Sequence, residues 1–409
     1  METMLLEHGH EPAAPGEIAD AVIVNTCAVT AESGRKSRQT IRRLRDENPG
    51  AVIAVCGCYS QLDPDAVAKT GADVIFGSND HAGMVAALEN ALGTGEHSTS
   101  IDEPFKRRVF EQLPAGAVAG RTRAMLKIQD GCVNFCTYCI IPYTRGRLRS
   151  LPLDAAAAET ARIDAEGYRE IVLTGIEISS WGQDLHDGSS LIDLMEAVSA
   201  AAPRLRLRLG SLEPRTITED FCRRAAALPN LCPHFHLSLQ SGCDATLHRM
   251  NRRYDTARFR QSVDLLRQYF DHPAITTDVI CGFPQETEEE FSATLAFLEE
   301  CRFAAMHVFP YSIRPGTKAA DMPQVPGPVK EERAARAGAL AARLHRAYLE
   351  ECVGRTYPVL FEQPVAGRYG GHAPNYMEVA VSGGEDLHNR VLPVRITGTD
   401  GEILWGELE

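Results

Sequence analysis

The chain has 409 residues, of which 44% are hydrophobic and 24% are charged, and its formal net charge is −13. This composition is typical of a globular protein of two or three domains, and the negative charge argues against a globally basic nucleic-acid coat while leaving room for a local basic surface. No apolar run approaches the ~18 residues of a membrane span, and the first residues resemble no secretory leader, so we expect a cytoplasmic protein without membrane contact.

Residues 20–92 alternate strand-like and helix-like segments. Strands are expected at 20–26, 51–56 and 72–76, and helices at 31–48, 62–69 and 81–92. This alternation predicts a parallel sheet, whose functional side chains gather at the carboxyl ends of the strands. Cys27 and the pair Cys56 and Cys58 occupy such ends. Residues 93–120 are rich in glycine, proline, serine and charge, and we expect them to form a linker.

The alternation resumes near residue 123. Strands are expected at 124–129, 170–174, 205–209, 234–239, 275–281 and 304–309, and helices at about 153–166, 190–202, 217–228, 255–270, 286–301 and 328–350. Six β/α units with short loops predict an open or partial barrel. Residues 353–409 instead alternate short apolar runs with turn residues, which predicts four or five strands in a small β-barrel.

Twelve cysteines in a chain expected to be cytosolic favour metal, cluster or catalytic roles over disulfides. Cys132, Cys136 and Cys139 have the spacing C-x-x-x-C-x-x-C and directly follow the first strand of the predicted barrel. Three thiolates on one short loop can hold three irons of a 4Fe-4S cube and leave the fourth iron open to a substrate or cofactor. The alternative is a zinc loop without its fourth ligand, or a set of buried thiols.

This spacing, with Tyr138 just before the third cysteine, resembles the signature of the radical S-adenosylmethionine (SAM) enzymes. Further motifs follow in order along nearly the whole chain and resemble the radical-SAM methylthiotransferases. They lie at 26–30, 56–61, 140–147, 173–177, 237–244, 250–254, 277–287 and 309–317. The run AsnThrCysAlaValThr, followed by ArgLysSerArgGln at 35–39, is most similar to the members that act on threonylcarbamoyladenosine in tRNA.

The resemblance implies an α/β protein of three parts. Residues 1–95 would form a parallel-sheet methylthiotransferase domain, residues 118–348 a radical SAM core with a partial (β/α)6 barrel, and residues 350–409 a small TRAM-like, RNA-binding β-barrel. The implied reaction is methylthiolation of C2 of N6-threonylcarbamoyladenosine at position 37 of tRNA, with two SAM molecules and two 4Fe-4S clusters. The implied partners are the tRNA anticodon stem-loop and an electron donor such as flavodoxin or ferredoxin.

Three alternatives stay open at this point. Close members of the family modify isopentenyladenosine in tRNA or an aspartate of a ribosomal protein. A protein of a different class, which carries iron–sulfur clusters and binds RNA without modifying it, is the third. Cleavage of SAM separates this last alternative from the enzymes.

The resemblance assigns Cys132, Cys136 and Cys139 to the catalytic radical SAM cluster. Cys27 and Cys58 match two of the three cysteines that hold the family's second cluster. The third ligand normally lies upstream of these, where this sequence has no cysteine. We therefore expect that the chain lacks the start of its N-terminal domain, with Cys56 as the candidate substitute ligand.

The remaining candidate residues follow the predicted strands. Those expected to bind SAM are Tyr138, Gly175, Glu177, Glu213, Gln240 and Gly282. A glycine lets the backbone approach SAM closely, and the carboxylate of Glu213 suits the ribose hydroxyls; the alternatives are a turn glycine and a solvated carboxylate. Arginines near the cluster loop or after the fourth barrel strand are expected to contact RNA phosphates. They are Arg145, Arg147 and Arg252.

Overall fold

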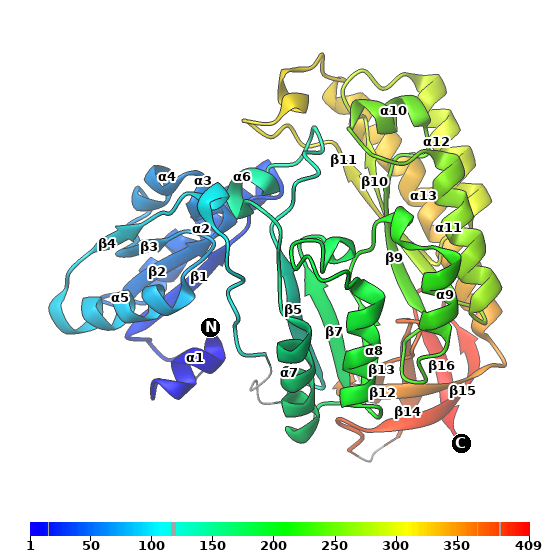
Figure 1. The fold of residues 1–409 in the computed structure, drawn as a ribbon, viewed down its shortest axis with the longest axis horizontal. Helices are drawn as coiled ribbons and strands as arrows, with labels where there is room; N and C mark the ends of the chain where they lie inside the picture. Colours follow the sequence, from blue (N-terminus) through cyan, green and yellow to red (C-terminus); the bar gives the residue numbers. More distant parts are fainter. Residues whose placement is uncertain (15, 116–119, 366, 384–385) are drawn as a thin grey trace. The chain divides into compact units, whose positions relative to one another are not determined.

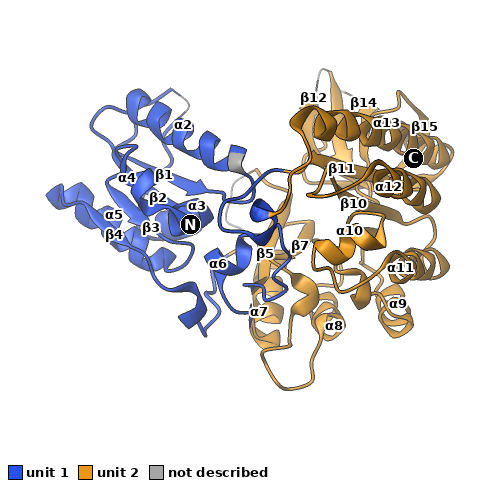
Figure 2. Ribbon diagram, turned by 90° about the horizontal axis from the view of Figure 1, so that it is seen from above, with its two compact units in different colours: residues 1–114, 130–149, 312–321 blue, residues 115–129, 150–311, 322–409 orange. Residues whose placement is uncertain are grey.

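The structure is a computed structural model that describes residues 1–14, 16–115, 120–365, 367–383 and 386–409 (Figure 1). It divides into two compact units (Figure 2). Unit 1 contains residues 1–114, 130–149 and 312–321, and unit 2 contains residues 115–129, 150–311 and 322–409. Within the described ranges, no helix combines the length and the apolar character needed to cross a bilayer.

Unit 1 is built on a four-stranded parallel sheet with the order β1-β2-β3-β4. Its strands are β1 (Ala21–Thr26), β2 (Val52–Gly57), β3 (Val74–Phe76) and β4 (Ser98–Ser100). Its helices are α1 (Glu2–Glu7), α2 (Ala31–Glu47), α3 (Cys58–Leu62), α4 (Pro64–Ala68), α5 (His81–Thr94) and α6 (Ile141–Arg145). The predicted parallel sheet is confirmed, and Asp63 caps α4 with Pro64 at the first helical position, as the sequence indicates.

The expectation that 93–120 is a linker is wrong for its first part. Residues 98–100 pair with β3 as the fourth strand of the sheet. This strand is three residues long, polar and at the edge of the sheet, so it lacks the apolar alternation by which strands are recognised. The last part of that segment, 116–119, lies outside the described residues.

The core of unit 2 is a curved sheet of six parallel strands. These are β5 (Arg123–Asp130), β7 (Glu170–Gly175), β8 (Arg206–Leu209), β9 (His234–Gln240), β10 (Ala274–Cys281) and β11 (Ala305–Pro310). The hydrogen-bonded orders are β6-β5-β7-β8, with the short β6 (Arg149–Ser150) beside β5, and β9-β10-β11. A bridge between Leu212 and Leu237 joins the two groups, which confirms the predicted partial (β/α)6 barrel.

Helices cover the outer face of this barrel (Figure 1). They are α7 (Leu153–Ala165), α8 (Leu191–Ala201), α9 (Glu219–Ala226), α11 (Thr256–Tyr269), α12 (Glu288–Cys301) and α13 (Gly327–Cys352). The short α10 (Asp244–Arg249) follows the carboxyl end of β9. On β9, Phe235, Leu237 and Leu239 are completely buried, whereas His236 and Ser238 are only half-buried. Because successive side chains of a strand point to opposite faces, the apolar set faces the helices and the polar set faces the barrel interior.

The C-terminal residues of unit 2 form a closed barrel, as predicted. Its strands are β12 (Thr356–Val365), β13 (Arg368–His372), β14 (Glu378–Ser382), β15 (Val391–Thr399) and β16 (Leu404–Leu408), in the order β12-β13-β14-β16-β15. Arg208 donates to the Pro374 carbonyl at 2.9 Å and pairs with the buried Glu170 at 2.7 Å. Although burial opposes it, the neighbouring arginines hold the pKa of Glu170 down to about 2, so an ionised pair within the partial barrel holds Arg208 while Arg208 donates to the C-terminal barrel.

Candidate functional site

The three closely spaced cysteines lie on a loop of unit 1 that the backbone holds at several points. The loop begins at Gly131, which has φ +76°, and a Cβ there would overlap the Arg147 carbonyl. The Cys132 amide donates to the Gly146 carbonyl at 3.1 Å, and the Cys139 amide donates to the Cys136 carbonyl at 2.9 Å. All three cysteines are partly exposed. The loop therefore presents three thiols from a fixed backbone.

Cys27 and Cys58 lie at the carboxyl ends of adjacent strands in the same unit. β1 and β2 are parallel, and Thr26 pairs with Gly57, so the two cysteines directly follow neighbouring positions. Gly57 has φ +105°, and a Cβ there would overlap the Thr26 carbonyl, so only glycine allows the strands this approach. Cys27 is exposed and Cys58 is buried.

Cys56 lies on the other side of the sheet from Cys58. It packs among Ala54, Val74 and Met84, whereas Cys58 belongs to the apolar cluster of Val24 and Ile41. Burial raises the pKa of the Cys56 thiol to about 11, which disfavours the thiolate that a metal needs. The role of Cys56 as a substitute ligand stays a prediction, and its surroundings argue for a core residue.

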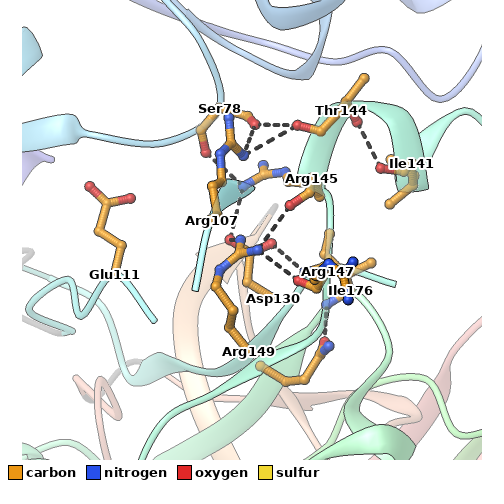
Figure 3. A network of polar contacts seen from close by, with 12 residues as sticks. Ser78, Arg107, Glu111, Asp130, Ile141, Thr144, Arg145, Arg147, Arg149 and Ile176 are labelled. Carbon is orange, nitrogen blue, oxygen red and sulfur yellow. Dashed lines mark hydrogen bonds and ion pairs between the residues drawn. The ribbon is translucent and has the colours of Figure 1, made fainter. Parts of the chain in front are cut away.

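Arg145 connects the two groups of cysteines. Its Nε donates to Cys58 Sγ at 3.1 Å, and its Nη1 lies 3.2 Å from the Ser78 carbonyl oxygen and 3.5 Å from Asp130 Oδ2. Asp130, which precedes the cysteine loop, also pairs with Arg149 at 3.2 Å, and both of these side chains are 1% exposed. Figure 3 shows this cluster of arginines around Asp130. The guanidinium of Arg145 thus links Cys58 to the base of the loop.

Two buried arginines that the sequence did not single out support the same region of unit 1. Arg107 donates from Nη1 to Ser78 Oγ at 2.9 Å (Figure 3). It also donates from Nη2 to Gln61 Oε1 at 2.7 Å. Arg314 donates to the carbonyl of Thr30 at 3.0 Å, at the start of α2. The motifs that contain Gln61 and Arg314 were visible in the sequence, but the direction of these side chains was not.

In unit 2, Gly175 and Glu177 follow β7 and are held by Gln129. The Gln129 side-chain oxygen accepts from the amides of Ile176 at 3.1 Å and Glu177 at 2.8 Å. A Cβ on Gly175 would lie 2.7 Å from the Gln129 carbonyl oxygen, so this position requires glycine. Burial raises the pKa of Glu177 to about 7; Arg252 opposes this rise and Glu213 adds to it.

Glu213 belongs to the same group as Glu177. Its amide donates to Ser179 Oγ at 2.8 Å, and the Ser179 amide donates to Glu177 at 3.2 Å. The Glu213 carboxylate accepts from Arg215 at 2.8 Å. Arg252 and Glu213 both act electrostatically on Glu177. The structure therefore brings three of the sequence-predicted residues, Glu177, Glu213 and Arg252, into one polar cluster.

Gln240 ends β9 and Gly282 directly follows β10, with positive φ angles of 72° and 70°. A Cβ on Gly282 would lie 2.5 Å from Lys330 Cγ, and its amide donates to Glu286 at 2.8 Å. Gln240 is a non-glycine residue in the left-handed region, which costs of order 1–3 kcal/mol and is typical of functional positions. Both residues therefore lie at strand ends with constrained backbones.

The predicted RNA-binding arginines differ in their surroundings. Arg147 is exposed. Arg252 donates to Tyr254 Oη at 2.8 Å and to the Ser238 carbonyl at 2.9 Å. RNA binding by Arg145 stays a prediction, but its contacts with Cys58 and Asp130 favour a positioning role.

The cysteine loop fits a 4Fe-4S cluster better than a closed zinc site. Residues 131–140 supply three cysteines and no histidine, aspartate or glutamate. A structural zinc site takes four protein ligands, whereas three thiolates suit a cluster that keeps one iron open. Soft thiolates held by a fixed backbone are also the donors that iron–sulfur clusters prefer.

Comparison with known proteins agrees with this chemistry. The family described as the radical SAM superfamily matches residues 126–298, and the family described as uncharacterized protein family UPF0004 matches residues 1–77. The first match contains the cysteine loop, and the second contains Cys27 and Cys58.

Several curated proteins are similar over most of the chain. A threonylcarbamoyladenosine tRNA methylthiotransferase MtaB of Bacillus subtilis is 37% identical over 397 residues, which cover 95% of this chain and 88% of that protein. The MtaB protein of Thermotoga maritima is 37% identical and covers 83% of this chain and 77% of its own length. A tRNA-2-methylthio-N(6)-dimethylallyladenosine synthase of Nitratidesulfovibrio vulgaris is also 37% identical, over 98% of this chain and 93% of that protein.

Among solved structures, the radical SAM methyltransferase TsrM from Kitasatospora setae has a similar fold. The TM-score is 0.56 at 16% identity, and the alignment covers 89% of this chain and 71% of that one. At this identity the similarity extends to the fold alone.

Proposed function

Because this chain belongs to the radical SAM tRNA methylthiotransferases, we propose that it attaches a methylthio group to C2 of N6-threonylcarbamoyladenosine at position 37 of tRNA. The observation that carries this proposal is the 37% identity to the Bacillus subtilis MtaB protein over 95% of the chain. The alternative substrate, dimethylallyladenosine, is supported by the equal identity to the Nitratidesulfovibrio vulgaris synthase.

As a radical SAM enzyme, the protein uses SAM and a 4Fe-4S cluster. Cys132, Cys136 and Cys139 are the residues proposed to hold that cluster, with Tyr138 as a cofactor contact. When bound, cluster and SAM supply the one-electron chemistry that an unactivated aromatic C–H bond requires. The protein's part is to fix the three thiols, which the Gly131 turn and the Cys132 and Cys139 amide bonds do.

We infer a second cluster site to which Cys27 and Cys58 contribute two of the three cysteine ligands that the family uses; the third ligand is unassigned. Two features support it: the cysteines follow paired positions of β1 and β2, and Arg145 donates an N–H to Cys58. A hydrogen bond to a ligating sulfur stabilises its negative charge and orients it. Arg145 would thus position Cys58 while its own charge is balanced by Asp130.

In unit 2, the proposed SAM contacts are Gly175, Glu177, Glu213, Gln240 and Gly282. They follow four different strands of the partial barrel at their carboxyl ends, where enzymes of this architecture place their chemistry. Gly175 has no side chain of its own to screen its backbone. Arg215 orients Glu213 so that the carboxylate can accept hydrogen bonds from ribose hydroxyls.

The proposed substrate region is the anticodon stem-loop, whose unpaired bases can be splayed into an enzyme. Arg147 and Arg252 are proposed phosphate contacts, which position RNA without reading its sequence. A small redox protein such as flavodoxin or ferredoxin is the proposed source of electrons.

Mass spectrometry of tRNA nucleosides tests the proposed function directly. Cells without the gene are expected to lose 2-methylthio-N6-threonylcarbamoyladenosine, and the gene is expected to restore it. Loss of the methylthio form of dimethylallyladenosine instead would assign the other substrate and keep the family. No change in either nucleoside would overturn the proposed function.

A further inference from the structure

A group of side chains that could hold a metal ion lies in the partial barrel of unit 2. His236 on β9, Asp278 on β10 and His307 on β11 bring one ligand atom each within 4.8 Å of one another. His307 Nδ1 is 3.2 Å from Asp278 Oδ1, and His236 Nε2 is 3.4 Å from Asp278 Oδ2. The carboxylate therefore lies between two imidazoles.

The strand register creates this arrangement. Asp278 pairs directly with His307 across β10 and β11, and His236 pairs with Thr276 across β9 and β10. Thr276 and Asp278 are two residues apart and so share one face of β10. This is the face away from the buried Phe235, and hence the interior face of the barrel. Three neighbouring strands thus direct the three side chains to one place.

We propose that His236, Asp278 and His307 bind a divalent transition-metal cation, for which Zn²⁺ is a suitable probe. Two imidazole nitrogens and one carboxylate form a ligand set that zinc and non-haem iron accept, and that leaves at least one coordination position open. This inference does not depend on the proposed function, since it concerns only the strands of the partial barrel.

Contacts around the group suit a cation. Thr276 Oγ1 lies 3.0 Å from His236 Nδ1, which leaves Nε2 directed to Asp278. Orienting hydrogen bonds of this kind accompany most metal-binding histidines. Across the described ranges, no lysine or arginine is paired with the Asp278 carboxylate.

The ordinary interpretation is a hydrogen-bonded group that needs no ion. In that case His236 and His307 would only form the weak ion pairs with the Asp278 carboxylate that are common at partly exposed sites. The two interpretations differ in one measurable respect, because only a metal site binds zinc with defined stoichiometry and loses it when any ligand is removed.

Zinc binding to the reconstituted holoprotein tests the proposal. Iron and zinc are measured together by mass spectrometry after equilibrium dialysis, and affinity is measured by calorimetry. Preparations are matched for iron content so that vacant cysteine sites contribute equally. The variants are H307A, the isosteric D278N, and T276V, which removes only the orienting hydroxyl. The control is H248A, which removes an exposed histidine of α10.

We expect one zinc per chain above the background of the cysteine sites, unchanged in H248A. Zinc should be lost in H307A and D278N, and bound roughly tenfold or more weakly in T276V. Anomalous diffraction at the zinc edge should place the ion between the two histidines. The proposal is overturned if the holoprotein holds no such zinc, or if H307A and D278N bind it as tightly as the unchanged protein.

Discussion

The two groups of cysteines in unit 1 are built in different ways. Cys132, Cys136 and Cys139 come from one short loop, whose spacing alone brings three thiols together. Cys27 and Cys58 are far apart in the sequence and are brought together by the pairing of β1 with β2. A loop can assemble its ligand set locally, whereas the strand-end pair depends on the register of a folded sheet. Substitutions should therefore affect the two groups through different causes.

Removal of a loop cysteine should have the largest effect. Cys136→Ala leaves two thiols for a cluster that needs three, so methylthiolation of tRNA should fall to the level of a sample without enzyme. Cys243→Ala, at the start of α10, is the matched control and should remain active. The methylthio nucleoside is measured by mass spectrometry after incubation with tRNA and SAM. Activity of the Cys136 variant near that of the control would contradict the assignment of the loop.

The strand-end pair is tested by comparing two cysteines that are two residues apart. Cys58→Ala should abolish methylthiolation and lower the iron content, because it removes a proposed ligand of the second cluster. Cys56→Ala should retain both, since Cys56 packs in the apolar layer on the other side of the sheet. Iron analysis and the tRNA assay are made on both variants. Equal loss of iron in the two would make Cys56 a ligand and disprove its assignment to the core.

One glycine lies next to each group of cysteines, and substituting each glycine tests the two groups separately. Gly57→Ala forces a Cβ into the Thr26 carbonyl, and Gly131→Ala forces one into the Arg147 carbonyl. Each should destabilise the protein by about 1–3 kcal/mol, since both positions have positive φ. Gly338→Ala, inside α13 with open space around it, should be neutral or slightly stabilising. Denaturant unfolding measures the three.

Iron analysis extends the glycine experiment. Gly57→Ala should reduce the iron bound at Cys27 and Cys58. Gly131→Ala should reduce the iron bound at the cysteine loop. A loss confined to the opposite group in either variant would contradict the role given to that glycine.

Arg145 should have the smallest effect, and its hydrogen bond to sulfur acts on the strand-end pair. Arg145→Gln removes the N–H bond to Cys58, so the reduced form of a cluster there loses stabilisation and its reduction potential should fall. Arg145→Lys keeps the charge near Asp130 but loses the planar donor. The reduction potential of the cluster in this variant should therefore lie between the potentials in the unchanged protein and in Arg145→Gln. Potentials are followed by electron paramagnetic resonance. An unchanged potential in both variants would limit Arg145 to a structural role.

The sequence was most informative where chemistry is local. The loop cysteines follow from their spacing, and the barrel strands follow from alternating apolar segments with helix signals between them. The polar edge strand β4 was missed because Ser98, Thr99 and Ser100 carry no apolar pattern. Arg145 was assigned to RNA because its position beside the loop is visible in the sequence, whereas the direction of its guanidinium toward Cys58 is not.

The histidine and aspartate group in unit 2 shows the same limit. His236, Asp278 and His307 occupy three different strands and have no motif spacing, so only the register of β9, β10 and β11 brings them together. Motif spacing in a sequence does not predict which side chains meet across paired strands, even where each strand is predicted correctly.

Cys132, Cys136 and Cys139 are proposed to hold the cluster that cleaves SAM without any contribution from Cys27 and Cys58. Formation of 5′-deoxyadenosine from SAM by the reduced protein tests this proposal most directly. Cys58→Ala should still form 5′-deoxyadenosine, although it should no longer modify tRNA, and Cys136→Ala should form none. Product at the unchanged level from Cys136→Ala, or none from Cys58→Ala, would contradict it.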